Sequence, residues 1–248
     1  MLRHDPEVIG ELHVQVLRAV ARANDATEVP DLRLDGGTAL AAFYLSHRQS
    51  EDLDVFGGLT LNARALGERV RDELAREGVD FEVAGPQTAG FARFIARERD
   101  GGEATGVRVD FAATSPFLLE SIEPTEEGIG IASFRDVCAG KLHALCDRFE
   151  ARDYVDLHAI LHRPAGNEPV DETLLRTRFR TLLDDLILID PGIDARYVGQ
   201  GFARAMDKPL LSLFPLRLLK PLTDAEIQAT LRLCFDECAR IVSKLSPE

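Results

Sequence analysis

The chain has 248 residues, of which 45% are hydrophobic and 29% are charged, and this balance indicates a globular protein rather than a disordered one. Its 29 basic and 42 acidic residues give a net charge of −13, which argues against a protein that coats nucleic acid nonspecifically. No apolar run approaches the roughly 18 residues that a membrane helix needs, and the N-terminus lacks the residue order of a signal peptide. We therefore expect a soluble cytoplasmic protein with no membrane partner.

The first half of the chain mixes predicted helices and strands. Apolar residues spaced three and four apart predict a first helix over 6–23, with Asp5 as its cap and Pro6 at its first position. A short apolar run at 32–34 predicts a strand, which a tight turn and a helix up to residue 46 follow. The same patterns predict these further elements: a strand at 52–56, a helix at 62–76, strands at 79–84, 91–98 and 105–112, and a hairpin turn at 100–102.

A loop at 120–130, rich in Glu, Pro and Gly, separates this part from a mostly helical second half. The helices predicted there lie near 134–150, 152–161, 171–185, 195–204 and 223–244. We therefore predict an α+β fold, in which residues 1–125 form a domain with a small mixed β-sheet flanked by helices. Residues 126–248 would form a helical domain, with the active site in the cleft between the two.

Two carboxylates, Asp52 and Asp54, share one face of the strand predicted at 52–56, because successive side chains of a strand point to opposite faces. Their Cα atoms would lie about 6.7 Å apart, and two anions at that distance repel by about 2.5 kcal/mol at an effective dielectric near 20. A cation would offset this repulsion, and Mg²⁺ binds through one or two carboxylates plus substrate phosphates. A bare Asp-x-Asp is more typical of a solvated strand.

Gly36 and Gly37 follow the first predicted strand and precede a helix that begins near Thr38. Such a turn can hold a phosphate, because glycine lets the backbone approach closely and the first N–H groups of a helix lack helical partners. Thr38 would add a hydroxyl donor or cap the helix. Gly-Gly-Thr alone is also typical of an ordinary turn. Followed by Asp52 and Asp54 after one helix, it indicates a phosphate cradle opposite a metal site.

These residues resemble the first motif of a known superfamily. The pattern is Gly-Gly-Thr, a helix and then Arg-x-Ser-x-Asp-x-Asp, here Gly36, Gly37, Thr38, Arg48, Ser50, Asp52 and Asp54. It is similar to the nucleotidyltransferases that include DNA polymerase beta, in the variant found in AbiEii/AbiGii-like toxins of type IV toxin–antitoxin systems. The resemblance implies a nucleotidyltransferase domain at 1–125. It also implies that the glycines, Thr38, Arg48 and Ser50 bind an NTP, and that Asp52 and Asp54 bind Mg²⁺ or Mn²⁺. By the same resemblance, Ser50 is alternatively a modification site.

In that superfamily a neighbouring strand supplies a third carboxylate. Asp110 is the matching candidate, because Val107, Val109 and Phe111 share one face of a predicted strand and Asp110 lies on the other. By resemblance, Asp110 would be a metal ligand or the general base for the acceptor hydroxyl.

Residues 138–157 resemble the family's lysine-containing helix and its Arg-Asp-x-x-Asp-Leu segment. The resemblance implies that Lys141 contacts nucleotide phosphates. It implies that Asp153 and Asp156 position the lysine, the nucleotide or the acceptor. The two aspartates are equal candidates for the functional carboxylate. The segment is also typical of a salt-bridged helix start, where acidic residues are favoured.

The family implies transfer of an NMP from an NTP to an acceptor hydroxyl, with release of pyrophosphate. The implied acceptor is tRNA, and a separate antitoxin protein would neutralise the toxin. A protein hydroxyl or a small molecule such as an aminoglycoside is an alternative acceptor. Two other classes fit the same residues: a non-catalytic nucleotide-binding regulatory module, and a metal-dependent phosphohydrolase that needs no acceptor. The position of Gly-Gly-Thr before one short helix favours the transferase.

The cysteines and one histidine pair have structural explanations. The cysteine spacings place each pair on one predicted helix, so we expect buried thiols rather than disulfides at Cys138, Cys146, Cys234 and Cys238. His158 and His162 have helical spacing that could hold zinc, but the residues between them lack the Glu of the metalloprotease motif. We expect a satisfied pair of histidines at a helix end.

Overall fold

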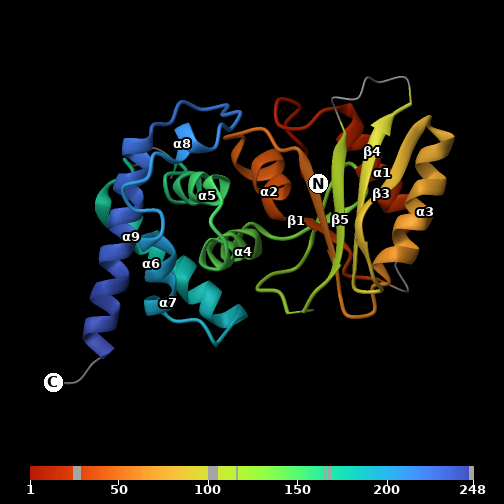
Figure 1. Cartoon of the computed structure of the whole chain (residues 1–248). Helices are drawn as coiled ribbons and strands as arrows, with labels where there is room; N and C mark the ends of the chain where they lie inside the picture. Colours follow the sequence, from red (N-terminus) through yellow and green to blue (C-terminus); the bar gives the residue numbers. More distant parts are fainter. Residues whose placement is uncertain (25–28, 100–105, 116, 165, 167–168, 246–248) are drawn as a thin grey trace. The chain divides into compact units, whose positions relative to one another are not determined.

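The computed structural model of the protein describes residues 1–24, 29–99, 106–115, 117–164, 166 and 169–245 (Figure 1). The chain divides into two compact units, Met1–Ser133 and Phe134–Glu248. All described strands belong to the first unit, and the described elements of the second unit are helices.

A mixed sheet forms the centre of the first unit, with the strand order β3-β4-β5-β2-β1-β7-β6. Its strands are β1 (Arg33–Asp35), β2 (Asp52–Gly57), β3 (Val79–Gln87), β4 (Phe91–Glu98), β5 (Val107–Ala113), β6 (Glu123–Pro124) and β7 (Gly130–Ile131). The pairs β2–β5 and β1–β7 are parallel, and the other neighbours are antiparallel. The predicted mixed sheet is therefore confirmed.

The sequence predicted a loop at 120–130, but β6 lies within this segment and β7 begins at its last residue, so this part of the prediction was wrong. Each has two residues, which is too short for an alternating pattern to be visible in the sequence. The hairpin turn predicted at 100–102 lies outside the described residues.

The helices of the first unit are α1 (Glu11–Ala23), α2 (Gly36–Thr38), the π-helical segment η1 (Ala39–Leu45) and α3 (Ala63–Arg76). Helix α3 packs against α1 and against strands β3, β4 and β5. Figure 1 shows α3 beside β3 and β4. The inward faces of the central strands are apolar, with Leu53 and Val55 of β2 and Val109 and Phe111 of β5 fully buried. This packing leaves the polar residues of the same strands on the opposite face.

The first helix begins at Glu11, so the prediction that it starts at Pro6 with Asp5 as its cap was wrong. Asp5 instead closes one separate turn, in which its carboxylate accepts from the backbone N–H of Glu7 at 2.9 Å and its carbonyl accepts from that of Val8 at 3.0 Å. The extended backbone of Gly10, with φ −94° and ψ −178°, then interrupts the helical path. The apolar spacing continues across this break because Val8 and Ile9 are buried with the helix.

The second unit contains α4 (Phe134–Asp147), α5 (Ala151–Leu161), α6 (Glu172–Ile189), α7 (Ala195–Ala203), α8 (Leu210–Leu213) and α9 (Asp224–Leu245). The five predicted helices are confirmed, and the four-residue α8 is an addition. Helix α4 packs against α5, α6 and α7, and α7 lies along α9 (Figure 1). Within the described residues, no helix combines the length and apolar character needed to cross a membrane.

The expectations for cysteine and histidine are confirmed. All four cysteines are buried free thiols, and burial raises the pKa of Cys146 and of Cys238 to about 12, so both stay neutral. The rings of His158 and His162 stack with centroids 4.1 Å apart. Each ring lies within hydrogen-bond distance of the Thr230 hydroxyl, at 2.9 and 3.1 Å. These groups hold α5 against α9.

Helices α6 and α9 are joined by a buried carboxylate. Glu237 on α9 is 1% exposed, and its oxygens lie 3.0 Å from Arg176 Nη1 and 2.6 Å from Arg180 Nη2 on α6. Arg240 of α9 lies 3.4 Å away. Burial opposes the charge of Glu237, but the arginine hydrogen bonds outweigh it and hold its pKa below the usual value.

Replacing Glu237 by Gln should lower the free energy of unfolding by about 2 kcal/mol at pH 7, because two arginines lose a charged acceptor. A carboxyl with a lowered pKa stabilises the fold above the ordinary glutamate pKa of 4.5, and this contribution is lost as the pH falls through the folded-state value. In urea unfolding, the difference in the free energy of unfolding between pH 7 and pH 4 should therefore be smaller in the variant than in the natural protein. Glu172→Gln, which removes a mostly exposed partner of Arg176, is the control. An equal loss in both variants would contradict the role of Glu237.

Candidate active site

Charged residues alternate with buried apolar ones along the central strands of the first unit. In β2, Asp52 and Asp54 are partly exposed while Leu53 and Val55 are buried, and β5 shows the same alternation around Asp110. The parallel register pairs Asp54 with Asp110, and the antiparallel register pairs Asp54 with Asp35 of β1. Because paired residues share a face, Asp35, Asp52, Asp54 and Asp110 form one carboxylate face.

The glycine turn packs directly on this carboxylate face. Gly36 has φ +71°, a conformation that favours glycine, and a Cβ at this position would lie 3.0 Å from Cγ of Asp54 and 3.1 Å from its Cβ. The Asp54 carboxylate therefore occupies the space that a side chain at residue 36 would take. The Gly36 amide donates to the Asp35 carboxylate at 2.7 Å, so Asp35 is the cap of α2.

Replacing Gly36 by Ala should reduce nucleotide-dependent activity about a hundredfold, because the methyl group would displace the Asp54 carboxylate. Gly78 is a matched control, since its φ is +78° and a Cβ there meets nothing within 4 Å. Both variants should lose about 1 kcal/mol of stability through backbone strain. Steady-state rates and urea unfolding check this pair. Equal activity in the two variants would show that strain alone accounts for the effect.

Two arginines lie on the same face and bind its carboxylates. Arg93 of β4 donates from Nε and Nη2 to the two oxygens of Asp110, both at 2.7 Å. Arg108 of β5 donates from Nη2 to Asp52, and its Nε lies 3.9 Å from Asp110 Oδ2. The hydrogen bonds with Asp110 raise the pKa of Arg93 above its usual value. Asp52 and Asp110 are therefore each paired with a guanidinium group.

The chemistry of the carboxylate face suits a hard divalent cation. Carboxylate oxygens are the ligands that Mg²⁺ and Mn²⁺ prefer, and Gly36 lets the Asp54 carboxylate lie against the glycine turn. In the described part of the chain, no three His, Cys, Asp or Glu side chains converge as ligands. The arrangement of Arg93 and Arg108 gives a physical reason, because they turn Asp110 and Asp52 toward themselves. The assignment of the metal to Asp52, Asp54 and Asp110 stays a prediction.

Thr38 does not cap the helix, and that prediction was wrong, because Asp35 caps α2. The Thr38 side chain is buried, and its hydroxyl lies 2.7 Å from Ser50 Oγ and donates to the backbone carbonyl of Asp52. Arg48 is also buried and donates to the carbonyl of Gln49 at 3.0 Å. In this structure Thr38 and Ser50 fix the backbone from which Asp52 projects.

The lysine and aspartates predicted from the second half meet in the second unit. Lys141 of α4 places Nζ 2.7 Å from Asp156 Oδ2 and 3.4 Å from Asp153 Oδ1 of α5. Arg148 donates to both oxygens of Asp153, at 2.8 and 3.1 Å. Lys141, Asp153 and Asp156 are at most 5% exposed. Asp156 is the closer partner of the ammonium, whereas Asp153 is shared with Arg148.

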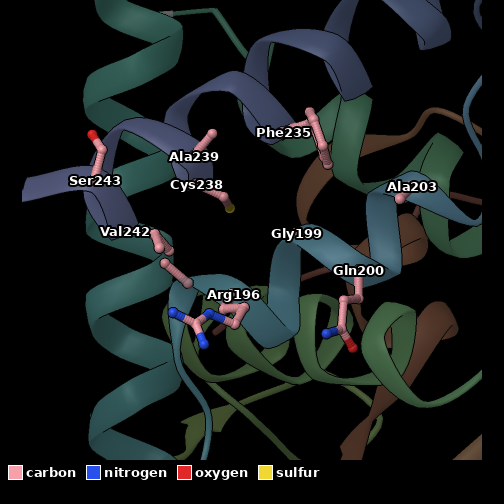
Figure 2. A pocket seen from close by; sticks show the side chains of 10 residues that line it. Arg196, Gly199, Gln200, Ala203, Phe235, Cys238, Ala239, Val242 and Ser243 are labelled. Atoms are coloured by element: carbon pink, nitrogen blue, oxygen red, sulfur yellow. The ribbon is translucent and has the colours of Figure 1, made fainter. Parts of the chain in front are cut away.

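A separate apolar pocket of about 400 Å³ lies between α7 and α9 in the second unit. Figure 2 shows Phe235, Cys238 and Val242 of α9 facing Gly199 and the neighbouring residues of α7. Arg196 supplies a charged group, but the predicted site residues do not line this pocket. It therefore does not enter the candidate active site.

Three charged residues of the carboxylate face were missed by the sequence analysis: Asp35, Arg93 and Arg108. Arg108 stands two residues before Asp110, so strand alternation alone could have placed it on that face. Arg93 and Asp35 required the strand order, which the local pattern does not contain. His13 of α1 was also missed; burial lowers its pKa, while the nearby Glu51 backbone and Asp52 charge partly oppose this shift.

Comparison with known proteins gives a family match over most of the chain. Residues 18–240 match the model of the family described as "Nucleotidyl transferase AbiEii toxin, Type IV TA system". This span includes every residue predicted for the site, from Gly36 to Asp156. No protein with a curated description matches the sequence at a significant level.

Solved structures share the fold at low sequence identity. JHP933 from Helicobacter pylori is 20% identical with a TM-score of 0.52, and the alignment covers 96% of this chain and 97% of that chain. A second crystal structure from H. pylori has 19% identity, a TM-score of 0.52 and coverages of 97% and 100%. MenT4, the nucleotidyltransferase toxin Rv2826c from Mycobacterium tuberculosis H37Rv, has 19% identity, a TM-score of 0.48 and coverages of 93% and 86%.

Proposed function

The chain belongs to the AbiEii nucleotidyl transferase toxin family of type IV toxin–antitoxin systems, and from this premise we propose how its residues carry out the transfer. As a nucleotidyltransferase of this family it uses an NTP, and a separate antitoxin is the implied partner. We propose that it moves an NMP to a tRNA hydroxyl with release of pyrophosphate, and that Mg²⁺ or Mn²⁺ is its cofactor.

One observation carries the proposal. Gly36, in a positive-φ conformation, packs on the Asp54 carboxylate, and Asp54 stands beside Asp110 in the parallel register of β2 and β5. A phosphate near the glycine backbone would therefore lie close to carboxylates that can hold a divalent cation.

The chemistry exchanges one phosphorus–oxygen bond for another. The acceptor oxygen attacks the α-phosphorus of the NTP, the bond to pyrophosphate breaks, and the acceptor proton passes to a base, for which Asp110 is the candidate. Asp52 and Asp54 are the residues that would hold Mg²⁺ or Mn²⁺, with Asp110 as a third ligand if it is not the base, and the ion when bound would supply Lewis-acid polarisation of phosphate oxygens. We assign Lys141 to the nucleotide phosphates and Asp156 to orienting Lys141, because their 2.7 Å contact fixes the ammonium.

The domain assignment and the acceptor belong to the same proposal. We propose residues 1–125 as the nucleotidyltransferase domain and 126–248 as a helical domain that contributes Lys141 and Asp156. Residues 134–248 carry 16 Lys and Arg against 18 Asp and Glu, whereas residues 1–133 carry 13 against 24. A polyanion such as tRNA is repelled less by the second unit, which supports its use as the RNA-facing surface.

A survey of acceptors tests the proposed function. Purified protein is incubated with each α-labelled NTP and Mg²⁺, together with total tRNA, with a protein acceptor pool or with no acceptor. We expect label on tRNA from the natural protein and none from Asp52→Ala. Label on protein instead would mean that the acceptor is a protein hydroxyl and that the reaction is still nucleotidyl transfer. NTP binding without any transfer would support a non-catalytic regulatory module.

A further inference from the structure

The charges on the carboxylate face alternate across neighbouring strands. Arg93 of β4 is the register partner of Asp110 of β5, and Arg108 of β5 is the partner of Asp52 of β2. Asp110 and Asp52 therefore each have a guanidinium group beside them on the same face. The bidentate geometry at Asp110, with two contacts of 2.7 Å, uses both of its oxygens.

These pairs conflict with the assignment of Asp52 and Asp110 as metal ligands unless the arginines move. A guanidinium group and a divalent cation are both positive and seek the same oxygen atoms, so binding of one excludes the other. The side chains of Arg93 and Arg108 are each 35% exposed, whereas Asp110 and Asp52 are 13% and 18% exposed. The arginines thus lie on the solvent side and can leave without opening the apolar core.

The released arginines would have a clear ligand. Cation binding adds two positive charges and takes the carboxylates away from both guanidinium groups. The net charge around the two arginines becomes more positive, which favours binding of an anion. Guanidinium groups bind phosphate oxygens with the same two-pronged geometry that they use for carboxylates. An NTP bound beside Gly36 presents such oxygens.

We propose that Arg93 and Arg108 are polyphosphate-binding residues that occupy Asp110 and Asp52 until a divalent cation displaces them. We call this pair the arginine latch. The proposal rests on the proposed function, because it assumes that the carboxylate face receives both a cation and an NTP. Its consequence is coupling: the cation and the nucleotide each make binding of the other easier.

Two calorimetric titrations test the arginine latch in the full-length protein. The first measures Mn²⁺ binding without nucleotide, and the second measures binding of an α,β-methylene NTP analogue at saturating Mn²⁺. We expect Arg93→Gln and Arg108→Gln each to bind Mn²⁺ about tenfold more tightly and the analogue about tenfold more weakly. Arg97→Gln is the control, because Arg97 lies four residues farther along the same face of β4 and pairs with Glu82 at 3.3 Å.

The outcomes separate this proposal from the proposed function. If Asp54→Asn keeps full Mn²⁺ affinity, the metal site itself is wrong. If Asp54→Asn weakens Mn²⁺ binding but the arginine variants match Arg97→Gln, the arginine latch is overturned and the metal site stands. Should a glutamine variant fail to fold by circular dichroism, Arg93→Lys and Arg108→Lys keep the charge but lose the two-pronged geometry. These variants should tighten Mn²⁺ binding to a smaller extent, and unchanged or weaker binding in them would equally overturn the proposal.

Discussion

Replacing Asp54 by Asn should lower the rate of nucleotidyl transfer by about a thousandfold or more, which corresponds to about 4 kcal/mol of transition-state stabilisation. Asp54 stands between Asp35 and Asp110 in the strand register and is the carboxylate on which Gly36 packs. Asparagine keeps the shape but removes the negative charge, so a cation would lose a strong ligand. Stability should stay within about 1 kcal/mol or rise, because the variant relieves repulsion among carboxylates.

Single-turnover rates and urea unfolding measure the two halves of this expectation. Asp80→Asn is the matched control, since Asp80 lies on β3 of the same sheet and pairs with Arg99 at the surface. The control should transfer nucleotide at the natural rate. If Asp54→Asn loses activity only in proportion to a loss of folded protein, then Asp54 is a structural residue.

Replacing Lys141 by Met should lower the free energy of unfolding by about 3–5 kcal/mol, because it removes the ammonium group 2.7 Å from the buried Asp156 carboxylate. Asp156 is fully buried, and Lys141 Nζ is 2.7 Å from it. Asp153 keeps Arg148 and is affected less. Nucleotidyl transfer by the fraction that remains folded should also fall, because the ammonium group is assigned to phosphate charge.

A double variant separates the pair from the rest of the core. Lys141→Met combined with Asp156→Asn removes both charges. The double variant should lose at least about 1 kcal/mol less free energy of unfolding than the two single variants lose in sum. Lys244→Met, at an exposed position near the end of α9, is the control and should change stability by less than about 1 kcal/mol. Strict additivity in the double variant would mean that the ion pair contributes nothing to the fold.

The carboxylates of β2 and β5 could be placed on one face from the sequence, because strand alternation is a local property of the chain. Asp52, Asp54 and Asp110 follow this rule, as the burial of Leu53, Val55 and Val109 confirms. The spacing of apolar residues likewise located the long helices of the second half. The pairing of Lys141 with Asp156 needed the packing of α4 on α5 in addition.

Features that depend on contacts between distant segments could not be predicted. Arg93 reaches Asp110 only because β4 and β5 are neighbours in a particular register, and Thr38 turns its hydroxyl to Ser50 and to the Asp52 carbonyl rather than to the helix end. The break at Gly10 was hidden because buried apolar residues continue on both sides of it. At Arg93 and Thr38 a tertiary contact prevailed over the local signal.

The most direct test of nucleotidyl transfer follows the two ends of the triphosphate. Parallel reactions contain tRNA and an NTP labelled either at the α-phosphate or at the γ-phosphate. Our account predicts that the α label becomes covalently attached to tRNA while the γ label appears in pyrophosphate in equal amount. Release of the γ label as inorganic phosphate without an acceptor, with no α label on tRNA, would contradict it and identify a phosphohydrolase.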